Sequence, residues 1–205
     1  MTVIDIYEFL DSKNISYERH DHPAVFTVKE AKLLSPKLAG AATKNIFLRD
    51  KKGSRNFLVT VPQDKQVDLK ALSLALDSSR LSFASPERLK THLGIEPGSV
   101  SLLALANDKE NNVEVFIDSE IWENTAILCH PLVNTSTLVL PRKSMERFLE
   151  KTGHRVRLIE IPVVWLNDDL YWETKYIFWG AAEIGLFGIN GLFLFATFFR
   201  TKQVS

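Results

Sequence analysis

The chain has 205 residues, enough for one domain with a buried core. Its 25 basic and 25 acidic side chains balance, so no overall charge draws it to nucleic acid. The single cysteine, Cys129, excludes an internal disulfide, and the first residues lack the apolar segment of a secretory signal; we expect a cytoplasmic protein.

Hydrophobic spacing, capping residues and turn residues predict alternating helices and strands. In the first half we expect a helix from Ile4 to Lys13, a strand over 15–20, a helix from Thr27 to Leu34, a β-hairpin of 43–50 and 57–61, and helices over 68–76 and 85–94. In the second half we expect strands over 113–117, 125–129 and 135–140, a helix over 141–151 and a strand over 155–161. This order predicts an α+β domain with a mixed, mainly antiparallel sheet.

Lys44 stands at the start of a β-like run, directly after the small residues Gly40, Ala41 and Ala42. A lysine in this position can hold an anionic ligand or a developing negative charge, whereas a solvated surface lysine is the alternative. Basic side chains are concentrated around it and face only Glu30 and Asp50. They are Lys29, Lys32, Lys37, Arg49, Lys51, Lys52 and Arg55. Such a patch can dock a phosphate backbone, and an ordinary solvated surface is the alternative.

Two further pairs of side chains give little support for a catalytic or metal site. Cys129 and His130 are neighbours, so on a strand they point to opposite faces and form no dyad; Cys129 is expected to be a buried apolar residue. His20 and His22 share one face of an expected strand but lack a third ligand. We therefore expect no metal and no cofactor.

Several segments occur in an order that identifies a family. They are 22–31, 43–50, 67–72, 81–89, 93–100, 115–118 and 130–135, and the similarity ends near Pro162. With these segments the chain resembles the YbaK/ProRS-associated family of aminoacyl-tRNA deacylases, most closely its ProXp-ala (PrdX) branch. The resemblance implies a YbaK-like fold and hydrolysis of mischarged alanyl-tRNA(Pro).

The resemblance also assigns residues to the reaction. It implies that Lys44, Gly98 and Ser99 are catalytic, with Lys44 engaging the ester or terminal nucleotide and the loop from Gly98 supplying backbone donors. It implies substrate contacts by Phe26, Thr27, Asn45, Val100, His130 and Asn134. Leu102 replaces the proline usual in the family's Gly-x-x-x-Pro loop, so we expect a looser loop, because proline restricts the backbone.

His130 is expected to act as a size filter, because alanine is smaller than proline and a tight pocket admits the smaller group. Asn134, four residues on, would share its strand face and support it. Alternative functions are hydrolysis of cysteinyl-tRNA(Pro) and a catalytically weak module that binds tRNA or a synthetase. The expected partners are the acceptor end of tRNA(Pro) and prolyl-tRNA synthetase.

The segment 163–205 differs from the family domain, which we place at 1–162. It contains an apolar run over 177–199, interrupted only by Glu183 and Asn190 and flanked by basic residues. A run of this length is enough to span a bilayer. A tail anchor to a membrane, an extra helix that covers an apolar patch, and a product of unusual splicing or gene-model error are the three explanations.

Overall fold

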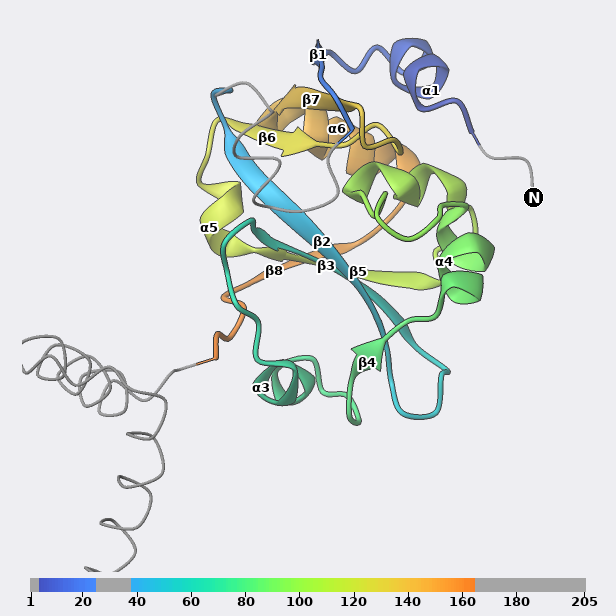
Figure 1. Cartoon of the computed structure of the whole chain (residues 1–205), viewed down its shortest axis with the longest axis vertical. Coiled ribbons are helices and arrows are strands. Elements are labelled where there is room, and N and C mark those ends of the chain that lie inside the picture. Colours follow the sequence, from blue (N-terminus) through green and yellow to red (C-terminus); the bar gives the residue numbers. More distant parts are fainter. Residues whose placement is uncertain (1–3, 25–37, 165–205) are drawn as a thin grey trace, which may run out of the picture. The chain divides into compact units, whose positions relative to one another are not determined.

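The computed structural model describes residues 4–24 and 38–164 (Figure 1). The expectations for Phe26, for Thr27 and its helix, and for the apolar run over 177–199 lie outside these residues. Within the described ranges, no helix has the length and apolar composition needed to cross a membrane.

The elements of the first half follow the predicted order. They are α1 (Ile6–Ser12), β1 (Glu18–Asp21), β2 (Ala41–Arg49), β3 (Asn56–Pro62), α3 (Leu69–Ala75), β4 (Ser82–Phe83) and α4 (Pro86–Leu93). Local signals set the helix ends: the Asp68 carboxylate accepts from the backbone N–H groups of Lys70 and Ala71, and Gly94 ends α4 with a positive φ of 65°.

The second half contains η1, a 3-10 helix (Leu102–Asn107), β5 (Val113–Asp118), α5 (Ser119–Trp122), β6 (Ala126–Cys129), β7 (Ser136–Pro141), α6 (Arg142–Thr152) and β8 (Val156–Ile159). The strands and helices expected here are confirmed to within a few residues. The elements β4, η1 and α5 were not predicted, because they are short and carry no clear hydrophobic period.

The strands form one mixed sheet in the order β1-β7-β6-β2-β3-β5-β8, with β4 paired to β2. Four of its pairings are antiparallel and three are parallel, so the expected α+β class and mixed sheet are confirmed, with more parallel pairing than expected. The sheet twists strongly, and α3 and α4 lie to either side of the β2–β3 hairpin (Figure 1).

Strand β2 occupies the centre of the sheet. One of its edges pairs with β3 from Thr43 to Arg49. Its other edge pairs with β6 only at Ala41 and Ala42, and with β4 only at Leu48 and Arg49. Between these short contacts, the middle of β2 has no strand partner on that edge among the described residues.

Two hydrophobic clusters pack against the sheet. One includes Phe47, Leu58 and Leu102, and the other includes Leu48 and Phe57. Neighbouring residues of β2 and β3 thus enter opposite clusters, as strand alternation requires. Cys129 is buried in the first cluster, as predicted, and this burial raises the pKa of its thiol to about 12.

A buried hydrogen bond between Asp108 and His154 anchors the segment before β5. The Asp108 carboxylate accepts from the backbone N–H groups of Asn112 and Val113 and from Nε2 of His154, which is 3.1 Å away. Both side chains are almost fully buried. Burial opposes ionisation of Asp108, but these hydrogen bonds outweigh it and hold the pKa of the carboxyl below its ordinary value.

We predict that Asp108→Ala lowers the free energy of unfolding by about 3 kcal/mol at pH 7, because it leaves buried donors without an acceptor. A depressed pKa stabilises the fold above the ordinary titration range, and this contribution is lost as the pH falls. The difference from wild type, measured by urea unfolding, therefore shrinks below about pH 4. The exposed control Lys109→Ala stays within about 0.5 kcal/mol of wild type. Equal stability of Asp108→Ala and wild type at pH 7 would contradict this.

Candidate functional site

Lys44 lies in β2 opposite Val61 and is partly buried. Alternation places it on the same face as Ile46 and Leu48, which contribute to the second hydrophobic cluster. Burial lowers the pKa of the Lys44 ammonium, and the nearby carboxylate of Asp64 partly opposes this effect. The residue is therefore more desolvated than the solvated surface lysine that was the alternative.

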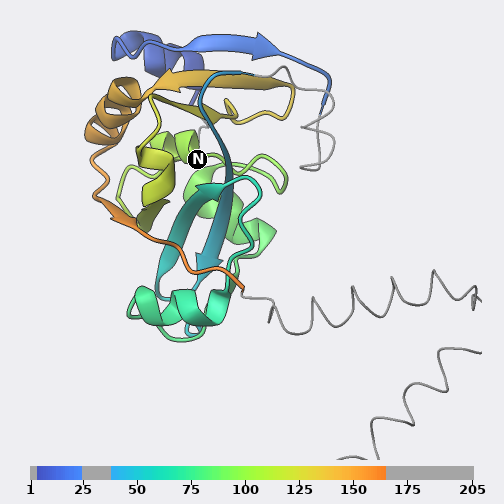
Figure 2. The same cartoon turned by 90° about the vertical axis from the view of Figure 1, so that its left-hand side faces the viewer.

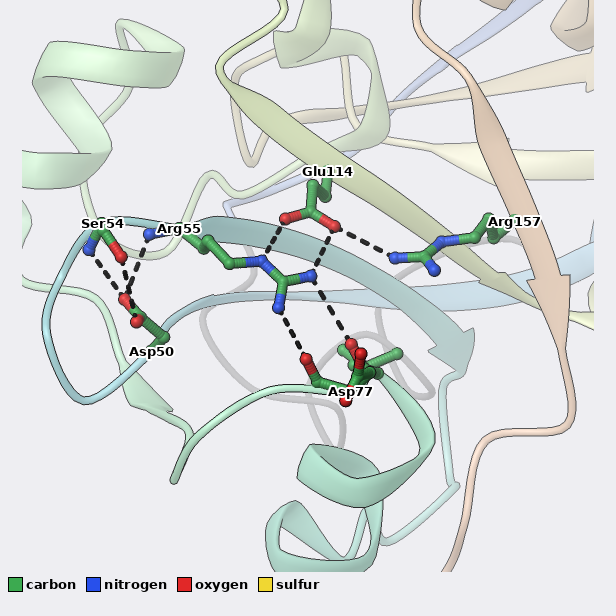
Figure 3. Close-up of polar contacts among 7 residues, drawn as sticks. Asp50, Ser54, Arg55, Asp77, Glu114 and Arg157 are labelled. Atoms are coloured by element: carbon green, nitrogen blue, oxygen red, sulfur yellow. Dashed lines mark hydrogen bonds and ion pairs between the residues drawn. The ribbon is translucent and has the colours of Figure 1, made fainter.

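The expected basic patch around Lys44 is not a single surface. Strand β2 continues for five residues beyond Lys44, about 17 Å, before Lys51 follows in the hairpin turn. Arg55 is engaged elsewhere, with its guanidinium bonded to both oxygens of Glu114 at 2.6 and 2.8 Å (Figure 3). Three further members, Lys29, Lys32 and Lys37, lie outside the described residues. The prediction counted basic residues along the sequence and did not allow for the distance that strand β2 places between them.

Asn45 follows Lys44 and faces the opposite side of the sheet. Its Oδ1 accepts a 2.8 Å hydrogen bond from the hydroxyl of Thr60, which is fully buried. This bond fixes the Asn45 amide against β3. The amide nitrogen is then the group that Asn45 can offer as a donor.

The loop from Gly98 to Leu102 differs in two ways from the expectation. The backbone N–H of Ser99 donates to the carbonyl of Glu96 within a turn, so it is not free to bind a ligand in this conformation. Leu102 is fully buried and begins η1, so its side chain anchors the end of the loop instead of loosening it. Gly98 has a φ of +91°, and a Cβ added to it would meet no atom within 4 Å, so backbone conformation and not crowding favours glycine there.

His130 lies in the loop between β6 and β7, so the expectation that it shares a strand face with Asn134 is wrong. Its Nδ1–H donates to the carbonyl of Ser136 at 3.1 Å, which leaves Nε2 as the acceptor of the neutral ring. Burial lowers the pKa of His130, the bond to Ser136 opposes this, and the adjacent His22 lowers it further. The ring is therefore neutral at pH 7.

His22 contacts His130 edge to face, with 6.4 Å between ring centroids. Its Nδ1–H donates to the carbonyl of Pro23 at 2.8 Å, and its Nε2 accepts from the hydroxyl of Thr137 at 3.0 Å. From the sequence, His22 was weighed only as a metal ligand together with His20. In the described part of the chain, no group of three metal-ligating side chains occurs. The support that His22 gives to His130 spans more than 100 residues, so sequence spacing could not reveal it.

Two hydrogen bonds bring three segments together at one end of the sheet. Thr43, beside Lys44, donates from its hydroxyl to the carbonyl of Leu128 at 2.8 Å. Ser101 donates from its hydroxyl to the carbonyl of His130 at 2.6 Å. The start of β2, the end of β6 and the Gly98 loop are therefore neighbours. No hydrogen bond or ion pair among the described residues joins Lys44 directly to His130 or Gly98.

A cavity of about 300 Å³ lies beside the start of β2. Its lining includes Ala41, Ala42 and Pro62, together with Asp64, the carboxylate whose charge acts on Lys44. A second cavity, of about 480 Å³, is lined by His92, Asp108 and their neighbours and contains none of the predicted site residues. The lining of the first cavity also lacks predicted site residues, but Asp64 links it to Lys44.

We predict that Lys44 loses its proton below the usual lysine value of 10.5, because burial disfavours the ammonium. Asp64→Asn should lower the pKa of Lys44 further, since it removes a stabilising negative charge. NMR titration of side-chain-labelled lysine, with Lys44→Arg to assign the signal, measures both effects. A Lys44 midpoint at or above 10.5 in wild type would contradict the assignment of a desolvated ammonium.

Comparisons with known proteins identify the family of the chain. Residues 22–148 match the family model described as the aminoacyl-tRNA editing domain. The prolyl-tRNA editing protein ProX of Acetoanaerobium sticklandii is 34% identical over 152 residues, which cover 74% of this chain and 93% of that protein. The prolyl-tRNA synthetase associated domain-containing protein 1 of Danio rerio is 39% identical, over 73% of this chain and 82% of that protein.

Solved structures share the fold. The crystal structure of hypothetical protein APE2540 superposes with a TM-score of 0.58 at 17% identity, over 75% of this chain and 97% of that one. A structure described as a candidate trans-editing enzyme for prolyl tRNA synthetase gives a TM-score of 0.57 at 15% identity, over 77% of this chain and 96% of that one. With a family match over more than half of its length and relatives above 30% identity, the chain belongs to the aminoacyl-tRNA editing domain family.

Proposed function

We propose that this protein is a trans-editing deacylase that hydrolyses the ester of alanine mischarged to tRNA(Pro), with residues 1–162 as the editing unit. The names of the relatives, a prolyl-tRNA editing protein and prolyl-tRNA synthetase associated proteins, support the prolyl system. The observation that carries the proposal is the Ser101–His130 hydrogen bond, which fixes the Gly98 loop beside the loop after β6. Thr43 joins the start of β2, and hence Lys44, to the same region.

In this proposal Lys44 supplies the positive charge. Ester hydrolysis by water builds negative charge on the carbonyl oxygen, and a desolvated ammonium stabilises such charge more strongly than a solvated one. In this role Lys44 acts through its positive charge and transfers no proton. The backbone N–H of Val100 is the loop donor on which the proposal relies, since Ser99 bonds to Glu96 in this conformation.

His130 acts as the size filter in this proposal. Its backbone carbonyl is held by Ser101 and its ring by Ser136 and His22, so the side chain has little freedom to move aside for a larger substrate. Proline is larger than alanine, and a rigid wall rejects it by steric overlap. Phe26, Thr27, Asn45 and Asn134 complete the proposed substrate contacts.

Hydrolysis of cysteinyl-tRNA(Pro) by the same site is the alternative substrate, because cysteine is also smaller than proline. The other alternative is a catalytically weak module that binds tRNA or prolyl-tRNA synthetase. The burial of Leu102 favours the enzyme over this alternative, since the substitution that was expected to loosen the loop leaves it anchored. The apolar run over 177–199 lies outside this editing unit. A membrane tether formed by it would affect where the protein is located and not the hydrolysis.

We predict that Lys44→Ala lowers kcat for alanyl-tRNA(Pro) by about 100- to 1,000-fold, the usual cost of one charge-stabilising group. Steady-state hydrolysis by the full chain, with alanyl-, cysteinyl- and prolyl-tRNA(Pro) compared, measures it. Lys44→Arg keeps the charge and tests whether position or charge matters. Full activity of Lys44→Ala, or a wild type that binds all three esters and hydrolyses none, would defeat the proposed function.

We predict that His130→Ala raises hydrolysis of prolyl-tRNA(Pro) about 10-fold relative to alanyl-tRNA(Pro), because it removes the wall that excludes the larger ring. The ratio of kcat/KM for the two substrates is the measurement. Ser101→Ala serves as the matched variant: it keeps the imidazole but frees its backbone, so we expect a smaller change in the same direction. An unchanged ratio for His130→Ala would remove His130 from substrate selection.

A further inference from the structure

Two imidazoles meet near the first residues of β7. This strand pairs with β1 on one edge and with β6 on the other, and His22 follows β1 while His130 follows β6. Figure 2 shows β1, in blue, running alongside β7, in gold. The two ring centroids are 6.4 Å apart and the ring planes are inclined by 73°. The edge of one ring therefore packs against the face of the other.

The first two residues of β7 each bind one of these rings. The Ser136 carbonyl accepts from Nδ1–H of His130 at 3.1 Å, and the Thr137 hydroxyl donates to Nε2 of His22 at 3.0 Å. The backbone N–H of His22 also donates to the carbonyl of Thr135 at 2.9 Å, so the contact between β1 and β7 extends to His22. Ser136 binds through its backbone. Thr137 binds through its side chain, which a substitution can remove.

Thr137 and Pro23 together fix the ring of His22. The Pro23 carbonyl can only accept a hydrogen bond, so it selects the tautomer with the proton on Nδ1, which is 2.8 Å away. Nε2 is then the acceptor of the neutral ring, and the Thr137 hydroxyl supplies its hydrogen bond. His22 is 9% exposed and Thr137 is 8% exposed, so little water can replace this bond. Hydrogen bonds at both ring nitrogens thus hold the plane of the imidazole.

The strand that carries Thr137 does not itself need the hydroxyl. Valine has the same shape as threonine and suits a strand equally well. A buried hydroxyl also costs free energy unless it finds a hydrogen-bond partner. For Thr137 that partner is Nε2 of His22, on the chain that follows β1. The polar group on Thr137 is therefore explained by the ring that it binds.

We propose that Thr137 is a positioning residue for substrate selection: its hydroxyl orients His22, and His22 holds the His130 imidazole in the place from which it excludes proline. The inference rests on the proposed function, in which His130 is the size filter. Thr137 touches no substrate and acts through two rings. Because these rings pack edge to face, a rotation of His22 would withdraw the contact that supports His130.

The test is Thr137→Val in the full chain, because valine keeps the shape of threonine and removes the hydroxyl. We expect the ratio of kcat/KM for prolyl-tRNA(Pro) to that for alanyl-tRNA(Pro) to rise about 3-fold, since the wall is loosened and not removed. The rise comes from faster hydrolysis of prolyl-tRNA(Pro), whereas a variant that only folds less well loses activity on both substrates. Thr137→Ser keeps the hydroxyl and should restore the wild-type ratio. Thr125→Val makes the same change at an exposed threonine and should leave the ratio unchanged.

A double-mutant cycle determines whether Thr137 acts through His130. In a His130→Ala background the size filter is already absent, so Thr137→Val should add no further change to the ratio. Three results would each overturn the inference and leave the deacylase intact. They are an unchanged ratio for Thr137→Val alone, an equal rise in the His130→Ala background, and a Thr137→Ser variant that behaves like Thr137→Val.

Nitrogen NMR of labelled imidazoles measures the positioning without any substrate. We expect the proton of His22 on Nδ1 in wild type, and Thr137→Val should shift the ring resonances of both His22 and His130, with His130→Ala to assign the second ring. Thr125→Val should shift neither. If wild type hydrolyses neither ester, the proposed function fails, and this measurement decides the positioning by itself. It also decides if Thr137→Val loses activity on both substrates. An unchanged His130 resonance in Thr137→Val would then overturn the inference.

Discussion

Two residues of parallel pairing hold the two halves of the sheet together. Ala41 pairs with Ile127 and Ala42 with Leu128, and no other pairing joins β2 to β6. The approach is close: a Cβ on Gly40, at its φ of +137°, would lie 2.9 Å from the carbonyl oxygen of Ala126. Glycine at position 40 is therefore required by contact with β6, in addition to any flexibility it provides.

The candidate site depends on where this pairing stops. Beyond Ala42 the strands separate, and the Thr43 hydroxyl spans the gap to the carbonyl of Leu128. The separation leaves an edge of β2 without a strand partner at Lys44, and it sends the chain after Cys129 into the loop that carries His130. A longer pairing would cover this edge. The open edge at the candidate site thus arises from incomplete sheet formation.

The sequence predicted those elements whose formation depends on neighbouring residues. The hairpin and the helices expected over 68–76 and 85–94 each depend on residues within a few positions of one another. All three are observed, with Asp68 and Ser85 as N-caps and Gly94 at the end of α4. The strand order and the three parallel pairings depend on partners that are distant in the chain. Periodicity indicates which face of a strand is buried but not which strand lies beside it.

The contrast between contacts that are near and far in the sequence also applies to the candidate site. Lys44 and His130 were identified through motifs, whereas the supports of His130 by Ser101 and His22 join residues that are 29 and more than 100 positions apart. Arg55, one member of the expected basic patch, is neutralised by Glu114 on β5, a partner that is distant in the sequence. Contacts with residues that are distant in the sequence therefore determine whether a charged side chain is free or neutralised.

The burial of Cys129 has a consequence for how this end of the sheet can be observed. A thiol reacts as its thiolate, and a pKa of about 12 in a closed core makes Cys129 inert while β6 is in place. Alkylating reagents reach it only when the strand that leads into the His130 loop opens. Because the chain has one cysteine, its labelling rate counts these openings directly and without an introduced probe.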